Sequence, residues 1–137
     1  MKKVFVDTNI LIDLLGYRKP FSKYAIEIFD KAERRKVELF VSSHSFATTH
    51  YLLKKYMMET ELREVLYALL DYLTIIAVDT DMIKKGLRSN YKDFEDALQI
   101  IAANSIRKLD YIVTRNLKDF SDSGIAILPP DELVRVI

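Results

Sequence analysis

Residues 3–9 of the chain are KVFVDTN, a short apolar run followed at once by an acid. The run at residues 3–6 is rich in β-formers and predicts a buried strand. Asn9 can cap a helix over residues 10–15. The stretch therefore predicts a strand that ends on the carboxylate of Asp7 and passes directly into a helix.

Beyond this stretch, short β-rich runs alternate with amphipathic helical segments. Further strands are predicted at residues 37–41, 73–78, 111–113 and 125–128. Helices are predicted at residues 21–35, 43–58, 80–87 and 93–108, with another after Thr60 and a last one from Asp131. Strands separated by helices indicate an α/β fold of three layers, α/β/α, in which helices cover both faces of a central parallel sheet of about five strands.

The composition places limits on the class of protein. A chain of 137 residues predicts one domain, and it buries roughly two-thirds of the surface that its unfolded form exposes. The absence of cysteine excludes disulfides and thiolate chemistry. A net charge of +1 gives no general argument for nucleic acid. We expect a cytoplasmic protein with no membrane partner, because no segment approaches the ~20 apolar residues of a membrane span and the N-terminal apolar run is too short for a signal peptide.

Acidic residues follow the predicted strands at the edge where a parallel α/β sheet places its ligand crevice. Asp7 follows the first strand, Asp119 comes shortly after the strand at residues 111–113, and Asp96 lies in the first turn of the helix before that strand. If these strands are neighbours, the three carboxylates converge. Converging carboxylates repel each other unless a hard cation neutralises them, and oxygen ligands favour Mg²⁺ or Mn²⁺. Such an ion can activate water against a phosphodiester.

Each of these acids also has a purely structural interpretation. Asp7 can be a helix cap or a turn residue, and Asp119 a turn residue. Asp93 lies where an N-cap is wanted, and the helix dipole favours an acid at Asp96. Asp13 is expected to be solvated or paired locally. The argument for chemistry therefore rests on the combination of acids and on no single one.

Three short motifs occur together: DTN at residues 7–9, DFEDAL at residues 93–98 and TRNLKDF at residues 114–120. In this order they resemble the PIN-domain family, and in particular its VapC-like toxin nucleases. Each motif is weakly specific alone, but together they are strong at this length and with this order of elements. The resemblance covers essentially the whole chain, which we interpret as a single PIN domain over residues 1–137.

The resemblance implies a PIN-like fold and an endoribonuclease that uses Mg²⁺ or Mn²⁺. It assigns catalysis and metal binding to Asp7, Asp96 and Asp119, with Asp93 as a further candidate ligand. The positions that support or orient these acids are Thr8, Asn9, Thr114 and Asn116. As a toxin, the protein would be held inactive by an antitoxin that covers the acidic groove, and it would form a homodimer.

One position departs from the family pattern. PIN domains usually carry a further acid in the helix after the second strand, and here that position falls at or near Thr48. A hydroxyl is a weaker substitute for a carboxylate. His44, one turn earlier on the same helix face, is a candidate to compensate as a ligand, proton carrier or substrate contact. Arg115 and Lys118 flank Asp119 and are candidates to hold substrate phosphates, or are ordinary surface charges.

The function that the sequence favours is metal-dependent hydrolysis of RNA by the toxin of a toxin–antitoxin pair. One alternative is a catalytically weakened PIN domain that binds RNA without cutting it, and Thr48 is the best evidence for it. The other is a receiver-like or phosphatase-like α/β domain that is phosphorylated on Asp7.

Overall fold

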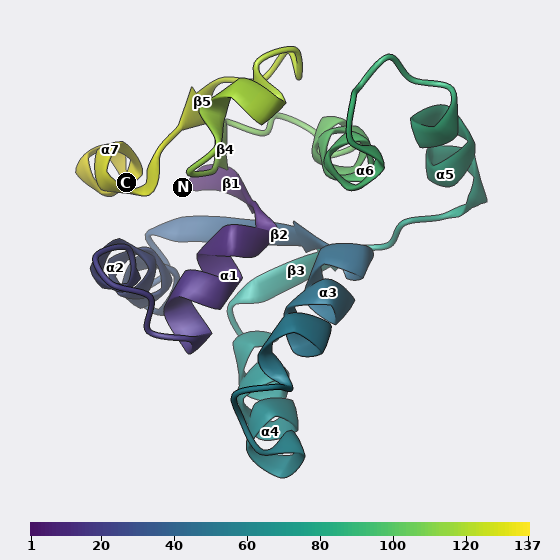
Figure 1. Ribbon diagram of the computed structural model, residues 1–137. Coiled ribbons are helices and arrows are strands. Elements are labelled where there is room, and N and C mark those ends of the chain that lie inside the picture. The colour runs from purple at the N-terminus through teal and green to yellow at the C-terminus, as the bar shows by residue number, and fades with distance from the viewer.

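The computed structural model describes residues 1–137 and contains one parallel sheet of five strands in the order β3-β2-β1-β4-β5 (Figure 1). The strands are β1 (Lys2–Val6), β2 (Val37–Ser42), β3 (Leu73–Ile76), β4 (Tyr111–Val113) and β5 (Ile127–Leu128). The α-helices are α1 (Thr8–Leu15), α2 (Ser22–Glu33), α3 (Ser43–Leu53), α4 (Glu59–Leu69), α5 (Thr80–Leu87), α6 (Phe94–Asn104) and α7 (Pro130–Val136), and a 3₁₀ helix, η1, spans Leu117–Phe120. The predicted α/β fold with about five parallel strands is confirmed.

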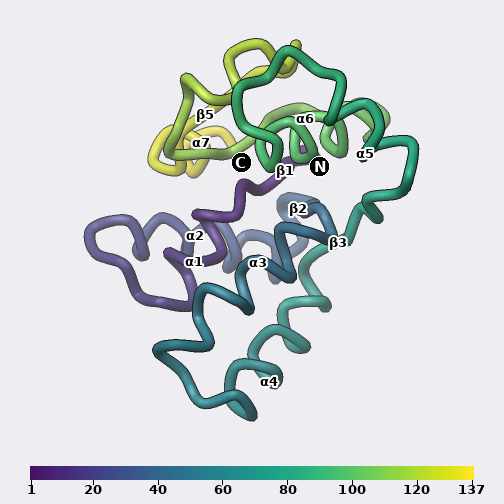
Figure 2. The backbone as a smooth tube through the Cα atoms, turned by 45° about the vertical axis from the view of Figure 1, so that its right-hand side comes forward, coloured from purple at the N-terminus to yellow at the C-terminus, as the bar shows by residue number.

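Side chains that alternate along the central strand divide the core into two layers. Val4 and Val6 pack into a large cluster that also holds buried residues of α1, α2, α4 and α7. Phe5, between them, packs on the other face with Ile100 of α6 and Phe120 of η1. Figures 1 and 2 show α1, α2 and α3 together on one side of the sheet, with α6 and α5 on the other. The sheet is therefore covered on both faces, as the sequence predicted.

Two predicted helices end four or five residues earlier than expected, and the helix predicted at residues 21–35 ends at Glu33. The helix predicted to reach residue 58 ends at Leu53, and the backbone N–H groups of Tyr56 and Met57 both turn back to the Leu53 carbonyl. Met57 thereby packs against the larger core cluster. The helix predicted to reach residue 108 ends at Asn104, because the Ser105 hydroxyl donates to a carbonyl of the last turn and competes with the helical pattern.

The strand order creates a switch point between β1 and β4. The chain moves from β1 outward to β2 and β3, and then returns to build β4 and β5 on the other side of β1. The backbone N–H of Asp7 donates to the Val113 carbonyl at 3.1 Å, so the carboxyl ends of the two strands lie side by side. Ligand crevices of parallel α/β sheets form at such a point.

None of the helices combines the length and the apolar character that a membrane span requires.

Candidate active site at the carboxyl ends of β1 and β4

Asp7 is the centre of the site and is only 3% exposed. It occupies the N-cap position of α1, where Asn9 was expected, but its side chain makes no capping hydrogen bond. Its two carboxylate oxygens instead accept hydrogen bonds from Gln99 Nε2 at 3.1 Å and from Thr114 Oγ1 at 2.8 Å. Burial raises the pKa of Asp7, and these two hydrogen bonds oppose the increase. Asp7 is thus a buried carboxylate whose ionised form is stabilised by neutral hydrogen-bond donors.

The segment after β4 supports Asp7 from one side. Thr114 is fully buried, and its hydroxyl donates to Asp7 while accepting the backbone N–H of Asn116 at 2.9 Å. Asp119 follows in η1 with an exposed side chain, and its negative charge also raises the pKa of Asp7. Of the residues predicted to support the acid, Thr114 contacts Asp7 through its side chain, and Asn116 contacts Thr114 through its backbone.

The start of α6 brings the remaining acids to the same place. Asp93 is the N-cap residue, and its carboxylate accepts the backbone N–H of Asp96 at 3.0 Å, which confirms the predicted capping role. Burial, followed by the negative charge of Asp93, raises the pKa of Asp96 to about 7. The charges of Asp119 and Asp7 contribute further. The three predicted acids thus share one electrostatic neighbourhood, although they come from three separate segments.

Gln99 belongs to this site and was missed at the level of sequence. It lies one turn after Asp96 on α6, is 3% exposed and donates to Asp7. Its Oε1 is the only buried side-chain oxygen or nitrogen in the chain without a hydrogen-bond partner. The sequence did contain a signal for Gln99. It is a polar residue within the apolar run of α6, and its spacing from Asp96 places both on one helix face.

Helix α3 reaches the site through hydroxyl groups. The Thr8 hydroxyl forms a hydrogen bond with the buried Ser45 hydroxyl, which ties the start of α1 to the first turn of α3. Thr48 is half-buried, three residues after Ser45 and so on the same helix face. The side chain of Asn9 is half-buried. At the position where the family pattern places a further carboxylate, α3 carries Thr48.

His44 belongs to the first turn of α3 and faces the first turn of α6. Its Nδ1 is 3.0 Å from the Ser42 hydroxyl, and the residue is half-buried beside Glu95. Burial lowers the pKa of His44, and Glu95 opposes the decrease. The imidazole therefore packs at the border of the acidic site, in contact with the neighbour of Asp96.

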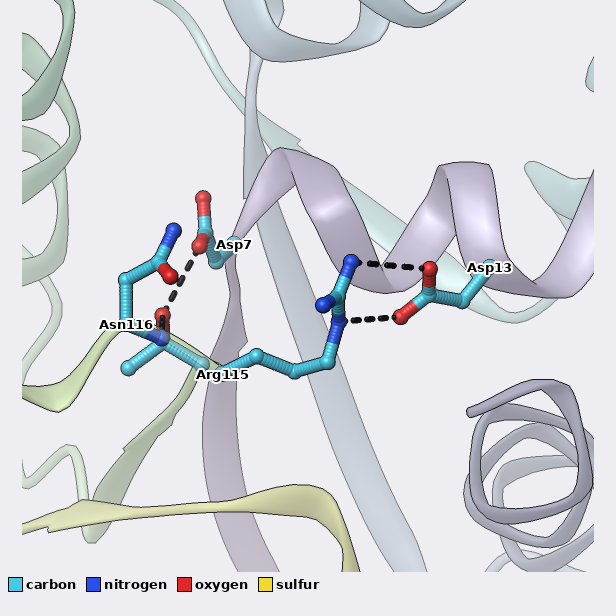
Figure 3. A network of polar contacts seen from close by, with 5 residues as sticks. Asp7, Asp13, Arg115 and Asn116 are labelled. Atoms are coloured by element: carbon cyan, nitrogen blue, oxygen red, sulfur yellow. Dashed lines mark hydrogen bonds and ion pairs between the residues drawn. The ribbon is translucent and has the colours of Figure 1, made fainter. Parts of the chain in front are cut away.

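Arg115 forms an ion pair with Asp13 of α1. Its Nε and Nη2 donate to the two carboxylate oxygens of Asp13 at 2.7 and 3.1 Å (Figure 3). Its guanidinium also stacks on the Phe21 ring, 3.9 Å from the ring centroid. The Asp13 side chain is 1% exposed. The expectation of a solvated or locally paired Asp13 was wrong, because a helix that buries an acid within its apolar face needs a buried cation. Lys118 is exposed beside Asp119.

The potential metal ligands at this site fit a hard cation that keeps part of its water shell better than one that protein atoms surround completely. All the polar atoms around Asp7 and Asp96 that carry charge are oxygens, and their mutual repulsion raises the pKa of Asp96. No three acidic or histidine side chains lie close enough together to enclose an ion directly. Mg²⁺ commonly keeps several waters and uses only one or two carboxylates. The unpartnered acceptor on Gln99 beside Asp7 suits such water-mediated binding.

Comparison with known proteins gives relatives over nearly the whole chain. The chain is 27% identical over 136 residues to "Ribonuclease VapC1" of Aquifex aeolicus, a match that covers 96% of this chain and 92% of the relative. A toxin–antitoxin complex from Klebsiella pneumoniae contains a chain with a similar structure, with a TM-score of 0.67, 28% identity, and coverage of 93% of this chain and 97% of the other.

A second similar structure is "VapC20" of Mycobacterium tuberculosis, described as a Sarcin-Ricin loop cleaving toxin. Its TM-score is 0.66 at 16% identity, with coverage of 90% of this chain and 96% of the other, which supports the fold alone. The family model for the PIN domain matches residues 3–118, a range that includes Asp7 and Asp96 and ends one residue before Asp119. With the parallel sheet and its acidic switch point, this match shows that the chain belongs to the PIN domain family.

Proposed function

We propose that this PIN domain is a metal-dependent endoribonuclease and the toxin of a toxin–antitoxin pair. The observation that carries the proposal is the position of Asp7, buried at the switch point with its charge coupled to Asp119 and Asp96. Its relative in Aquifex aeolicus carries the name ribonuclease. Asp7, Asp96 and Asp119 would hold Mg²⁺ or Mn²⁺, with Asp93 at the margin.

Residues of the chain itself would favour ionised acids and a bound cation at this site. When bound, the cation supplies Lewis-acid stabilisation of a phosphodiester and lowers the pKa of water. Thr114 and Gln99 orient both oxygens of Asp7 and favour its ionised form. Asp96, with a pKa of about 7, is partly protonated at neutral pH, so cation binding there releases a proton. Lys118, exposed and next to Asp119 in the sequence, would contact a substrate phosphate.

Cleavage of RNA by the purified protein tests this assignment. We expect cleavage of a structured RNA with Mn²⁺ and none with excess chelator, and we expect Asp96→Asn to abolish it with an unchanged circular dichroism spectrum. Asp71→Asn is the matched control, because Asp71 is exposed and precedes β3 at the opposite edge of the sheet. Full activity of Asp96→Asn would refute the site.

The second candidate function is RNA binding without cleavage. It is favoured by Thr48, which leaves α3 without an acid at the position where the family pattern places one. A protein of this kind would retain RNA in the presence of Mn²⁺ and leave it intact. The phosphoacceptor alternative is disfavoured, because Asp7 is buried and both its oxygens are already hydrogen-bonded.

Besides the acidic groove that the antitoxin would cover, an apolar cleft is the proposed surface on which it docks. It lies between α1, α2 and α4 and is lined mostly by hydrophobic side chains, among them Leu14, Leu15, Ile26, Phe29, Val65 and Leu69. Exposed apolar clefts of this kind mark sites of protein interaction. The Klebsiella pneumoniae relative was solved as a toxin–antitoxin complex. Co-purification of the adjacently encoded small protein with wild type, and its loss with Ile26→Asp, would support this surface; retained co-purification would refute it.

We also propose that the protein forms a homodimer, as the family resemblance implies. Light scattering of the purified chain tests this, and a mass of 16.0 kDa at micromolar concentration would refute it.

A further inference from the structure

The amide of Gln99 lies at the meeting point of the acidic residues. Its side chain comes from the buried face of α6, one turn after Asp96, and crosses to Asp7 at the end of β1. It is 97% buried, which follows from its exposure of 3%. An amide in this position contacts one proposed metal ligand and shares a helix face with another.

The orientation of this amide is fixed by the charge of Asp7. An ionised carboxylate can only accept hydrogen bonds, so the NH₂ group of Gln99 must face it, and a flipped amide would place two oxygens in contact. Oε1 and Nε2 of one amide are about 2.2 Å apart, given standard bond lengths. With Nε2 at 3.1 Å from Asp7 Oδ1, Gln99 Oε1 lies within about 5 Å of that carboxylate.

Gln99 Oε1 is a buried acceptor that nothing in the chain satisfies. Buried acceptors in native proteins almost always have a partner, which is either a protein group or an ordered water. Here no protein donor is available, and the carboxylate beside it is a proposed cation ligand. The missing donor is therefore expected to arrive with the cation's hydration shell.

We propose that Gln99 is a positioning residue of the metal site, which holds Asp7 through Nε2 and accepts a hydrogen bond from the hydrated cation through Oε1. This inference rests on the proposed function. It explains how a site with few direct carboxylate ligands, and a hydroxyl on α3 at Thr48, retains a divalent ion. Outer-shell partners of this kind typically change metal affinity by 10–100-fold when they are replaced.

Titration calorimetry of metal-stripped protein with Mn²⁺ tests the proposal without relying on cleavage. Gln99→Met keeps the length of the side chain and removes both the donor and the acceptor, and we expect it to bind Mn²⁺ about 10–100-fold more weakly than wild type. Asn104→Leu is the matched control, since it removes an amide of the same helix whose hydrogen bonds go to Ile100 and Ser123, away from the acids. We expect its Mn²⁺ affinity to equal that of wild type.

A second variant separates the role of the N–H donor of Gln99 from the role of its oxygen acceptor. Gln99→Glu loses the N–H donor but keeps oxygen acceptors, so we expect it to bind Mn²⁺ at least as tightly as wild type at pH 8. Its metal-free form should unfold at a lower temperature, because a second carboxylate then faces Asp7. A role in packing alone would not produce this split between the Met and Glu variants.

The outcomes distinguish this inference from the proposed function. If wild type itself binds no Mn²⁺, the proposed function fails. If wild type binds Mn²⁺ and Gln99→Met binds it within twofold of wild type, the inference is overturned and the metal site stands. If Gln99→Met does not fold, the Glu variant decides, since an affinity tenfold or more below wild type would overturn the acceptor role.

Discussion

Replacing Arg115 with methionine should destabilise the metal-free protein by about 3 kcal/mol. The guanidinium donates to both oxygens of Asp13 at 2.7 and 3.1 Å, and the two side chains are 21% and 1% exposed. Removing one partner of a buried pair costs about 3–5 kcal/mol because the other charge stays buried. We take the lower end, since Arg115 is partly exposed and Asp13 can take up a proton.

The cost of Arg115→Met should depend on pH. Burial raises the pKa of Asp13, and Arg115 is the main group that opposes this increase. In the variant the folded-state pKa is therefore higher still, and the unfolded value is unchanged. A raised folded-state pKa gives stability that is present below the unfolded pKa and is lost as pH rises through the folded pKa. The deficit of the variant should shrink between pH 8 and pH 5.

Urea unfolding followed by circular dichroism measures this deficit, and a shift in melting temperature of about 10 °C should accompany it. The double variant Asp13→Leu with Arg115→Met should recover most of the loss, because an apolar pair leaves no buried charge. A deficit below about 1 kcal/mol would mean that the pair is worth no more than a surface ion pair. Weaker RNA binding with unchanged stability would instead restore the interpretation of Arg115 as a phosphate contact.

Three further outcomes follow from the same site. Thr114→Val removes the hydroxyl that donates to Asp7, so its Mn²⁺ affinity by calorimetry should fall about tenfold; an unchanged affinity would contradict the support role. The metal-free protein should lose stability as pH rises through about 7, because the pKa of Asp96 is raised to about 7 and its stabilising proton is then released. Melting temperatures at pH 6 and pH 8 measure this loss, which saturating Mn²⁺ should reduce, and a metal-free protein more stable at pH 8 would refute the coupling. Thr48→Glu adds a carboxylate to the α3 face that contacts Thr8 through Ser45, so Mn²⁺ affinity and RNA cleavage should both rise; a decrease in both would show that α3 does not face the cation.

Local sequence signals located the elements and the acids. The apolar run before Asp7 and the cap at Asp93 were predicted because a strand end and an N-cap depend on neighbouring residues. The contacts of Gln99 and Arg115 were not, because their partners lie 92 and 102 residues away. The hydrophobic periodicity of a helix or strand does not indicate which distant side chain contacts a buried acid. Asp13 was expected to be solvated or paired locally, because its partner Arg115 lies 102 residues away in the sequence.

The order of the strands also has a consequence for synthesis. Asp7 is translated among the first residues, yet the side chains that hold it, Gln99 and Thr114, come from the last third of the chain. The central strand gains its second neighbour only when β4 has left the ribosome. A ribosome making this protein therefore carries an incomplete acidic centre for most of the elongation time. A product truncated before residue 99 would lack Asp119, one of the three proposed ligands, together with both supports of Asp7.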